Sequence, residues 1–198
     1  MSVEFRFHSE KVVEAASWLL HLHGEPMKYL GLLKMLYIAD RKALERMDET
    51  ITGDSAYSMA YGPVLSATYD LIKGNDIDKR QSIWNKHISK RFAMNHKEKK
   101  NYVKLIEMPL IQKLCEEEEE ILTEVYKEFG QLDPFTVAKW THSLPEWQDP
   151  ENLNKKSIPI SFEDVLKFLS RSDEEIDNIK DAVKRETYLD NILNAYSY

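Results

Sequence analysis

The sequence contains little cysteine and no long hydrophobic run. Its 198 residues include one cysteine, Cys115, which excludes an internal disulfide and a zinc site built from several cysteines. No apolar run approaches the roughly 18 residues that a membrane helix needs. The N-terminus also lacks the pattern of a secretory signal peptide. We therefore expect a cytoplasmic protein that does not contact a membrane.

Metal ligands in a usable arrangement are also scarce. His21 and His23 lie two positions apart, which does not place two ligands on one face of a helix, and no set of carboxylates accompanies them. The sequence therefore predicts no metal site and no cofactor.

The charges of the chain are unevenly distributed. Its formal net charge is −7 and its pI is near 5.5, yet residues 79–104 contain nine Lys or Arg against a single acidic residue, Glu98. This pattern indicates a basic surface feature on an acidic body. The overall acidity argues against a dedicated nucleic-acid binder, so nucleic acid is expected at most at residues 79–104.

The apolar residues, at 42% of the chain with four tryptophans, indicate a folded globule. Apolar positions cover most of the circumference of a helix predicted at residues 26–47, which is typical of a central, buried helix. Asp40 lies on that buried face with Leu33, Leu36 and Leu44. The predicted fold class is α+β: a mostly helical domain around this helix, with a small antiparallel sheet.

Two domains are expected, a main one at residues 1–150 and a helical C-terminal appendage at 151–198 packed on it. Residues 148–159 are rich in Asn, Lys and Pro and are interpreted as a linker. Apolar residues at even positions in 83–94 and 102–108, with a polar stretch between them, predict a basic β-hairpin with an exposed tip. Asp133 and Pro134 predict the start of a short helix that ends near His142.

Residues 52–70 are the most informative segment, because they combine a glycine turn, a strand-like run and a helix start. Gly53 and Gly62 supply backbone angles that other residues reach only at a cost. Pro63 is suited to the first position of a helix, which predicts a helix at residues 63–73. We expect a rigid corner here, and we use "the corner" for residues 52–70 below.

Three motifs carry a resemblance to a known family. They are Leu-Tyr-Ile-Ala-Asp at residues 36–40, the Thr-Gly-Asp and Tyr-Gly-Pro-Val blocks of the corner, and Trp-Thr-His at 140–142 followed by Trp147. In this order they resemble the Panacea domain of the SocA-like antitoxins of toxin–antitoxin systems, over roughly residues 10–150. The basic hairpin and the tail after Gln148 lie outside the segments that carry the resemblance.

The resemblance implies a non-enzymatic function: an antitoxin that neutralises a co-encoded toxin by direct protein–protein binding. It leaves open which toxin is bound and whether the chain forms a homo-oligomer. Two alternatives remain open. One is a phage- or prophage-encoded adaptor that delivers a client to a cytoplasmic protease. The other is a hydrolase centred on His142, with Ser66 or Asp40 completing a triad, although no nucleophile-elbow sequence is present.

The candidate site residues fall into two groups. Residues expected to bind the partner combine aromatic or arginine anchors with the rigid corner: Tyr57, Tyr61, Gly62, Pro63, Tyr69, Trp84 and Arg91. Residues expected to have structural roles are Asp40, Gly53, Asp54, His142 and Trp147. For Asp40 we expect hydrogen bonds from the corner or from a tyrosine hydroxyl, and for His142 we expect contact between the short helix and the corner.

Overall fold

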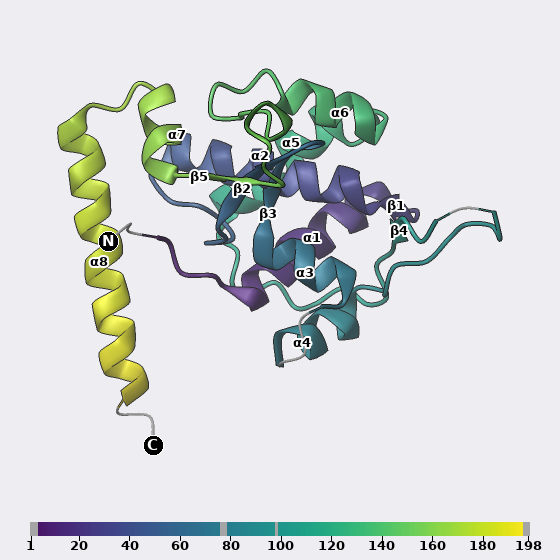
Figure 1. The fold of residues 1–198 in the computed structure, drawn as a ribbon. Coiled ribbons are helices and arrows are strands. Elements are labelled where there is room, and N and C mark those ends of the chain that lie inside the picture. Colours follow the sequence, from purple (N-terminus) through teal and green to yellow (C-terminus); the bar gives the residue numbers. More distant parts are fainter. Residues whose placement is uncertain (1–3, 76–78, 98, 196–198) are drawn as a thin grey trace.

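The structure is a computed structural model that describes residues 4–75, 79–97 and 99–195. It confirms an α+β fold that is mostly helical. Helix α2 (Tyr29–Met47) runs through the middle of the molecule and contacts α1 (Ser9–His23), α5 (Glu116–Phe129) and α6 (Pro134–Thr141) (Figure 1). The helix begins later than residue 26, because Met27–Lys28 form a short strand, β1.

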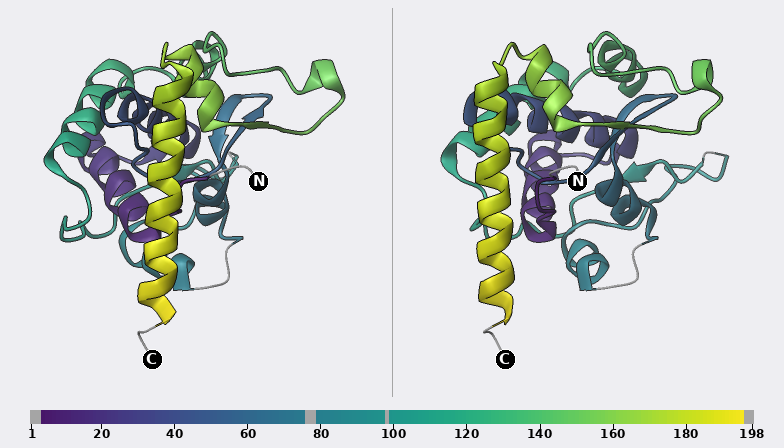
Figure 2. Two further views of the ribbon diagram at one scale, coloured as in Figure 1. Left: turned by 90° about the vertical axis from the view of Figure 1, so that its left-hand side faces the viewer. Right: turned by 60° about the vertical axis from the view of Figure 1, so that its left-hand side comes forward.

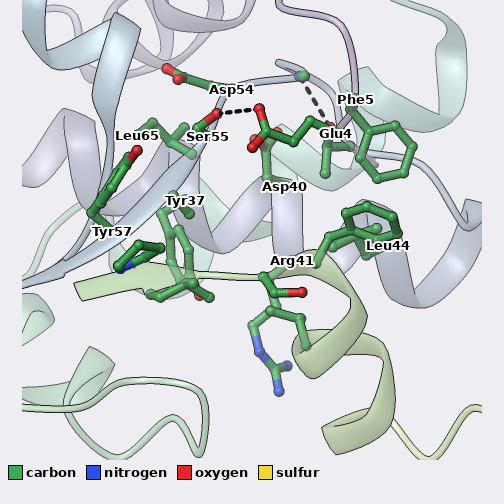
Figure 3. A pocket seen from close by; sticks show the side chains of 18 residues that line it. Glu4, Phe5, Tyr37, Asp40, Arg41, Leu44, Asp54, Ser55, Tyr57 and Leu65 are labelled. Carbon is green, nitrogen blue, oxygen red and sulfur yellow. Dashed lines mark hydrogen bonds between the residues drawn. The ribbon is translucent and has the colours of Figure 1, made fainter. Parts of the chain in front are cut away.

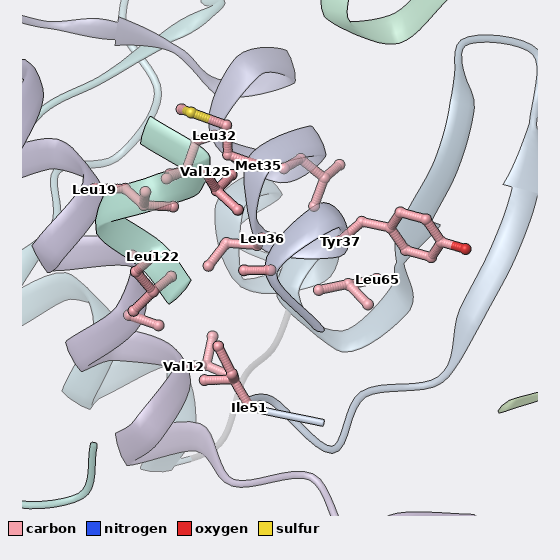
Figure 4. Close-up of a cluster of buried hydrophobic side chains, with 14 of the residues drawn as sticks. Val12, Leu19, Leu32, Met35, Leu36, Tyr37, Ile51, Leu65, Leu122 and Val125 are labelled. Atoms are coloured by element: carbon pink, nitrogen blue, oxygen red, sulfur yellow. The ribbon is translucent and has the colours of Figure 1, made fainter. Parts of the chain in front are cut away.

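The main core lies where α1, α2 and α5 meet. Leu19 of α1, Leu36 of α2 and Val125 of α5 are fully or almost fully buried and face one another (Figure 4). Apolar burial on this scale is the main stabilising term of a domain. The central position predicted for α2 is therefore confirmed.

A three-stranded antiparallel sheet covers another side of α2. Its strand order is β3 (Gly62–Leu65), β2 (Ala56–Met59), β5 (Ile158–Ile160). The prediction of a helix beginning at Pro63 is wrong, because residues 62–65 pair with β2 and helix α3 (Ser66–Lys73) begins after them. The carboxylate of Asp54 accepts hydrogen bonds from the N–H groups of Ala67 and Thr68, at 3.0 and 2.7 Å, and this capping fixes the helix start at Ser66.

The predicted basic hairpin is only partly correct. Residues 79–87 form helix α4 (Lys79–His87) rather than a strand, and Trp84 and Ile88 are four positions apart, a spacing that also fits a helix. Beyond α4, the described residues 88–97 and 99–105 form a protruding two-stranded arm, and we call residues 88–105 the basic arm. Bridges at Ile88–Leu105 and Phe92–Tyr102 join its two sides, and β4 (Tyr102–Val103) pairs with β1 at its base (Figure 1).

The C-terminal segment packs on the end of α2. Residues 151–153 form a 3-10 turn, η1 (Glu151–Leu153), and the segment expected to be a linker also supplies β5. Helices α7 (Phe162–Phe168) and α8 (Asp173–Ala195) share a second apolar cluster with Leu44 of α2. Figure 2 shows α8 along one side of the molecule, and the basic arm lies on the opposite side. The domain division at residue 150 stays a prediction.

The starts of α6 and α7 agree with their sequence signals. Asp133 caps α6 by accepting a hydrogen bond from the N–H of Phe135 at 2.9 Å, and Ser161 caps α7 in the same way. Within the described part of the chain, none of the helices has the length and apolar character needed to cross a bilayer.

Candidate functional site

Helix α2 holds the corner through a buried carboxylate. Asp40 accepts hydrogen bonds from the hydroxyl of Thr52 and from its N–H, the latter at 3.0 Å. Burial raises the pKa of Asp40 to about 7, against the lowering effect of the bonds from Thr52. The half-buried Asp54 in turn binds the start of α3. The corner is thus fixed at both ends by carboxylates.

The turn between β2 and β3 lies against α6. Gly62 has φ +88°, and a Cβ atom there would collide with the hydroxyl of Thr141 and approach the amine of Lys34. Gly53 has φ +65°, and a Cβ atom there would collide with the carbonyl of Arg6. Glycine is therefore required at both positions by backbone angle and by space.

Lys34 of α2 is a charged residue in the interior that sequence reasoning missed. Its side chain is fully buried, and its amine donates a 2.5 Å hydrogen bond to the carbonyl of Pro63. Burial lowers the pKa of Lys34 to about 7. A lysine within a helix that is apolar on all sides is a sequence signal for a buried amine, although it does not reveal that the amine binds the carbonyl of Pro63.

His142 and Trp147 connect α6 to the sheet. Their rings stack in parallel, with centroids 4.0 Å apart, and the indole N–H of Trp147 donates to the carbonyl of Met59 at 3.1 Å. Burial and then the nearby charge of Lys34 lower the pKa of His142. Among the described residues, no hydrogen bond links His142 to Asp40 or Ser66, so the geometry contains no assembled triad.

Glu146 completes the contact between α2 and the segment after α6. One of its oxygens, Oε1, accepts hydrogen bonds from the Tyr37 hydroxyl at 2.9 Å and from Arg41 Nε at 2.8 Å. Glu146 was also missed in the sequence. Together with Lys34 and His142, it brings the three resemblance motifs into one buried region.

Two neighbouring groups of aromatic residues lie near the corner: Tyr61 and Phe135 are exposed, whereas Tyr29 and Tyr69 are half-buried. Tyr61 and Phe135 are 63% and 56% exposed, and their rings meet edge to face with centroids 6.0 Å apart. In the second group, Tyr29 lies between Tyr69 and Arg91. The ring centroids of Tyr29 and Tyr69 are 6.3 Å apart, and the guanidinium carbon of Arg91 lies 5.6 Å from the Tyr29 ring centroid. We call these four aromatic residues and Arg91 the aromatic surface.

The two groups lie close together because the starts of α2 and α6 are in contact. Gly31 lies against the ring of Pro134, and Lys28 forms a 3.9 Å ion pair with Asp133. Arg91 belongs to the basic arm, so the arm continues this surface. The arm also contains Lys90, Lys97, Lys99, Lys100 and Lys104.

Four residues expected at the partner surface are not exposed there, and two of them, Gly62 and Pro63, are buried in β3. Trp84 is 1% exposed and belongs to the main core, so it cannot anchor a partner. Its indole packs inward because α4 turns its apolar side toward α1. Tyr57 is half-buried and lines a pocket between α2 and α7. Phe135, by contrast, was missed, because its contact with Tyr61 joins two segments that are distant in the sequence.

Comparison with protein families gives one finding. The family model described as "Antitoxin SocA-like, Panacea domain" matches residues 32–148. The match contains the buried region where the three motifs meet and also the basic arm, and it leaves out α1, β5, α7 and α8. The searches of curated proteins and of solved structures returned no match.

Proposed function

Because the chain belongs to the SocA-like antitoxin family with the Panacea domain, we propose that it neutralises a co-encoded toxin by binding it directly, without chemistry. The family match carries this proposal. The aromatic surface supports it, because interfaces concentrate their energy in a few aromatic and arginine anchors held on a rigid scaffold. The cytoplasm is the expected compartment for such a pair.

The proposed contact consists of the aromatic surface and the basic arm. Tyr61 and Phe135 project from the corner and from α6, and both elements are fixed by the buried region. Specific, stable interfaces bury on the order of 1,600 Å², which is more than one aromatic pair supplies, so Tyr29, Tyr69 and Arg91 are included. The lysines of the arm would attract an acidic patch on the toxin.

The decisive experiment is co-expression with the product of the adjacent gene. We expect the neighbour to inhibit growth alone, and we expect this chain to restore growth and to co-purify with it. A harmless neighbour, or a toxic one that is neither bound nor rescued, would refute the proposal. Rescue only while a cytoplasmic protease is active would replace it with the adaptor function.

The anchors can be tested separately. Replacing Tyr61 or Phe135 by alanine should weaken toxin binding by at least tenfold, a size typical of anchor residues, while the melting temperature stays within about 2 °C. Phe168→Ala is the matched control, because Phe168 is also half exposed but lies on α7. Equal effects of all three substitutions would show that the toxin does not use the aromatic surface.

A further inference from the structure

A pocket unrelated to the aromatic surface lies between the corner, α2 and the C-terminal segment. Its volume is about 340 Å³, within the range of small-molecule sites. Its walls include Leu44 of α2, Ile160 of β5 and Val165 of α7, and the N-terminal residues Glu4 and Phe5 close one side (Figure 3). The walls are therefore largely apolar.

The charged groups of the pocket are mainly acidic. Asp40 lines the pocket, and Glu4 reaches across to Ser55, with a carboxylate-to-hydroxyl distance of 3.4 Å (Figure 3). The half-buried Asp54, which binds Ala67 and Thr68, adds a second negative charge that repels the one on Asp40. Arg41 also lines the pocket, but its Nε binds Glu146. The pocket thus combines apolar walls with an excess of carboxylates.

These features specify the charge of a ligand. Each carboxylate oxygen has two acceptor positions, and the hydrogen bonds from Thr52 occupy one on each oxygen of Asp40, with a backbone bond from Ile51 beside them. Above its pKa of about 7, Asp40 is an ionised, buried carboxylate beside a second carboxylate, and this charge is costly unless a cation joins it. Within the described residues, no three His, Cys, Asp or Glu come close enough together to hold a metal ion. With walls of aliphatic and aromatic side chains, the cation that fits is organic.

We propose that this pocket binds a small organic ammonium compound, with its ammonium group at Asp40 and its apolar body against Leu44, Ile160 and Val165. Two of these wall residues lie outside the segment that matches the family. The ligand would therefore be a property of this chain rather than of the family domain, and its binding is independent of the toxin.

The test uses the full chain at pH 8 and two probes of matched shape, 2-phenylethylamine and 2-phenylethanol, with affinity measured by calorimetry. We expect the amine to bind at least tenfold more tightly than the alcohol. Asp40→Asn should remove this preference, because the amide keeps hydrogen bonds with Thr52 but has no charge. Ala56→Leu should weaken the binding of both probes, because the larger side chain fills the pocket. Ala60→Leu, on the exposed turn of the same hairpin, should leave their binding unchanged.

Three results would overturn the proposal. Equal affinity for the two probes, or none for either, would leave the carboxylates without a ligand role. An amine preference that survives both Asp40→Asn and Ala56→Leu would locate the binding elsewhere. Binding of a peptide with a free N-terminal phenylalanine, without binding of 2-phenylethylamine, would assign the pocket to a protein terminus instead.

Discussion

The corner and the basic arm are similar in length but are held in opposite ways. In the corner, the side chains of Asp40 and Asp54 bind backbone N–H groups, and Thr52, Ser58 and Thr68 are fully buried. In the arm, backbone bonds at two bridges join the strands, and the lysines near the tip are exposed. Rigidity is thus concentrated where the family motifs meet, and positive charge where few contacts constrain it.

This difference implies a division of tasks. A rigid region presents anchors in one geometry, which lowers the entropy lost on binding. An exposed charged arm changes the rate of encounter more than the final affinity. Substitutions in the corner should therefore change stability, and substitutions in the arm should change association.

The largest effect is expected at Gly62. Replacing it by valine puts a branched side chain at φ +88° and against Thr141 and Lys34, so the free energy of unfolding should fall by about 2–4 kcal/mol. Gly74→Val is the matched control, because Gly74 has φ +76° but open space around its Cβ position. It should lose only the backbone strain, about 1–2 kcal/mol. Equal losses in chemical denaturation would mean that the corner is not tightly packed.

The second effect concerns how the free energy of unfolding depends on pH between pH 5 and pH 7. The pKa of Asp40 is raised from 3.8 to about 7, so the folded protein holds a proton that the unfolded chain releases. The proton on Asp40 therefore contributes its full stabilisation below pH 4, and this stabilisation is lost as the pH rises through 7. Between pH 5 and pH 7, the free energy of unfolding of the wild type should fall by about 2 kcal/mol relative to that of Asp40→Asn. Parallel denaturation profiles of the two proteins would contradict the buried state of this carboxyl group.

Lys34 should have the opposite effect at higher pH: the free energy of unfolding should rise as the pH rises. Its pKa is lowered from 10.5 to about 7, so its contribution is complete above pH 10.5 and is lost as pH falls through 7. Between pH 7 and pH 9, the free energy of unfolding of the wild type should rise by about 2 kcal/mol relative to that of Lys34→Met. The replacement keeps the shape of the chain and removes its charge. A constant difference between the two proteins across this range would show that the amine is solvated.

The sequence predicts the interior better than the surface. The continuous apolar character of α2, the position of Asp40 on its buried face and the Asp133 cap are local signals, and each identifies its element. The helix at Lys79–His87 was missed because Trp84 and Ile88 fit both a helix and an alternating strand. The contact of Tyr61 with Phe135 and the bond from Lys34 to Pro63 depend on how distant segments pack, which no local pattern contains.

The smallest effect on stability and the clearest effect on kinetics are expected in the arm. Replacing Lys99 and Lys100 by glutamine should change the free energy of unfolding by less than about 0.5 kcal/mol, because both side chains are exposed. With the co-encoded toxin, the association rate at low salt should fall roughly threefold to tenfold, while the dissociation rate stays nearly the same. The difference should shrink as added salt screens the charges. Lys155→Gln with Lys156→Gln is the control, since these lysines are exposed near η1. If both pairs slow association equally, net charge explains the effect; if only the arm pair does, the arm faces an acidic patch on the toxin.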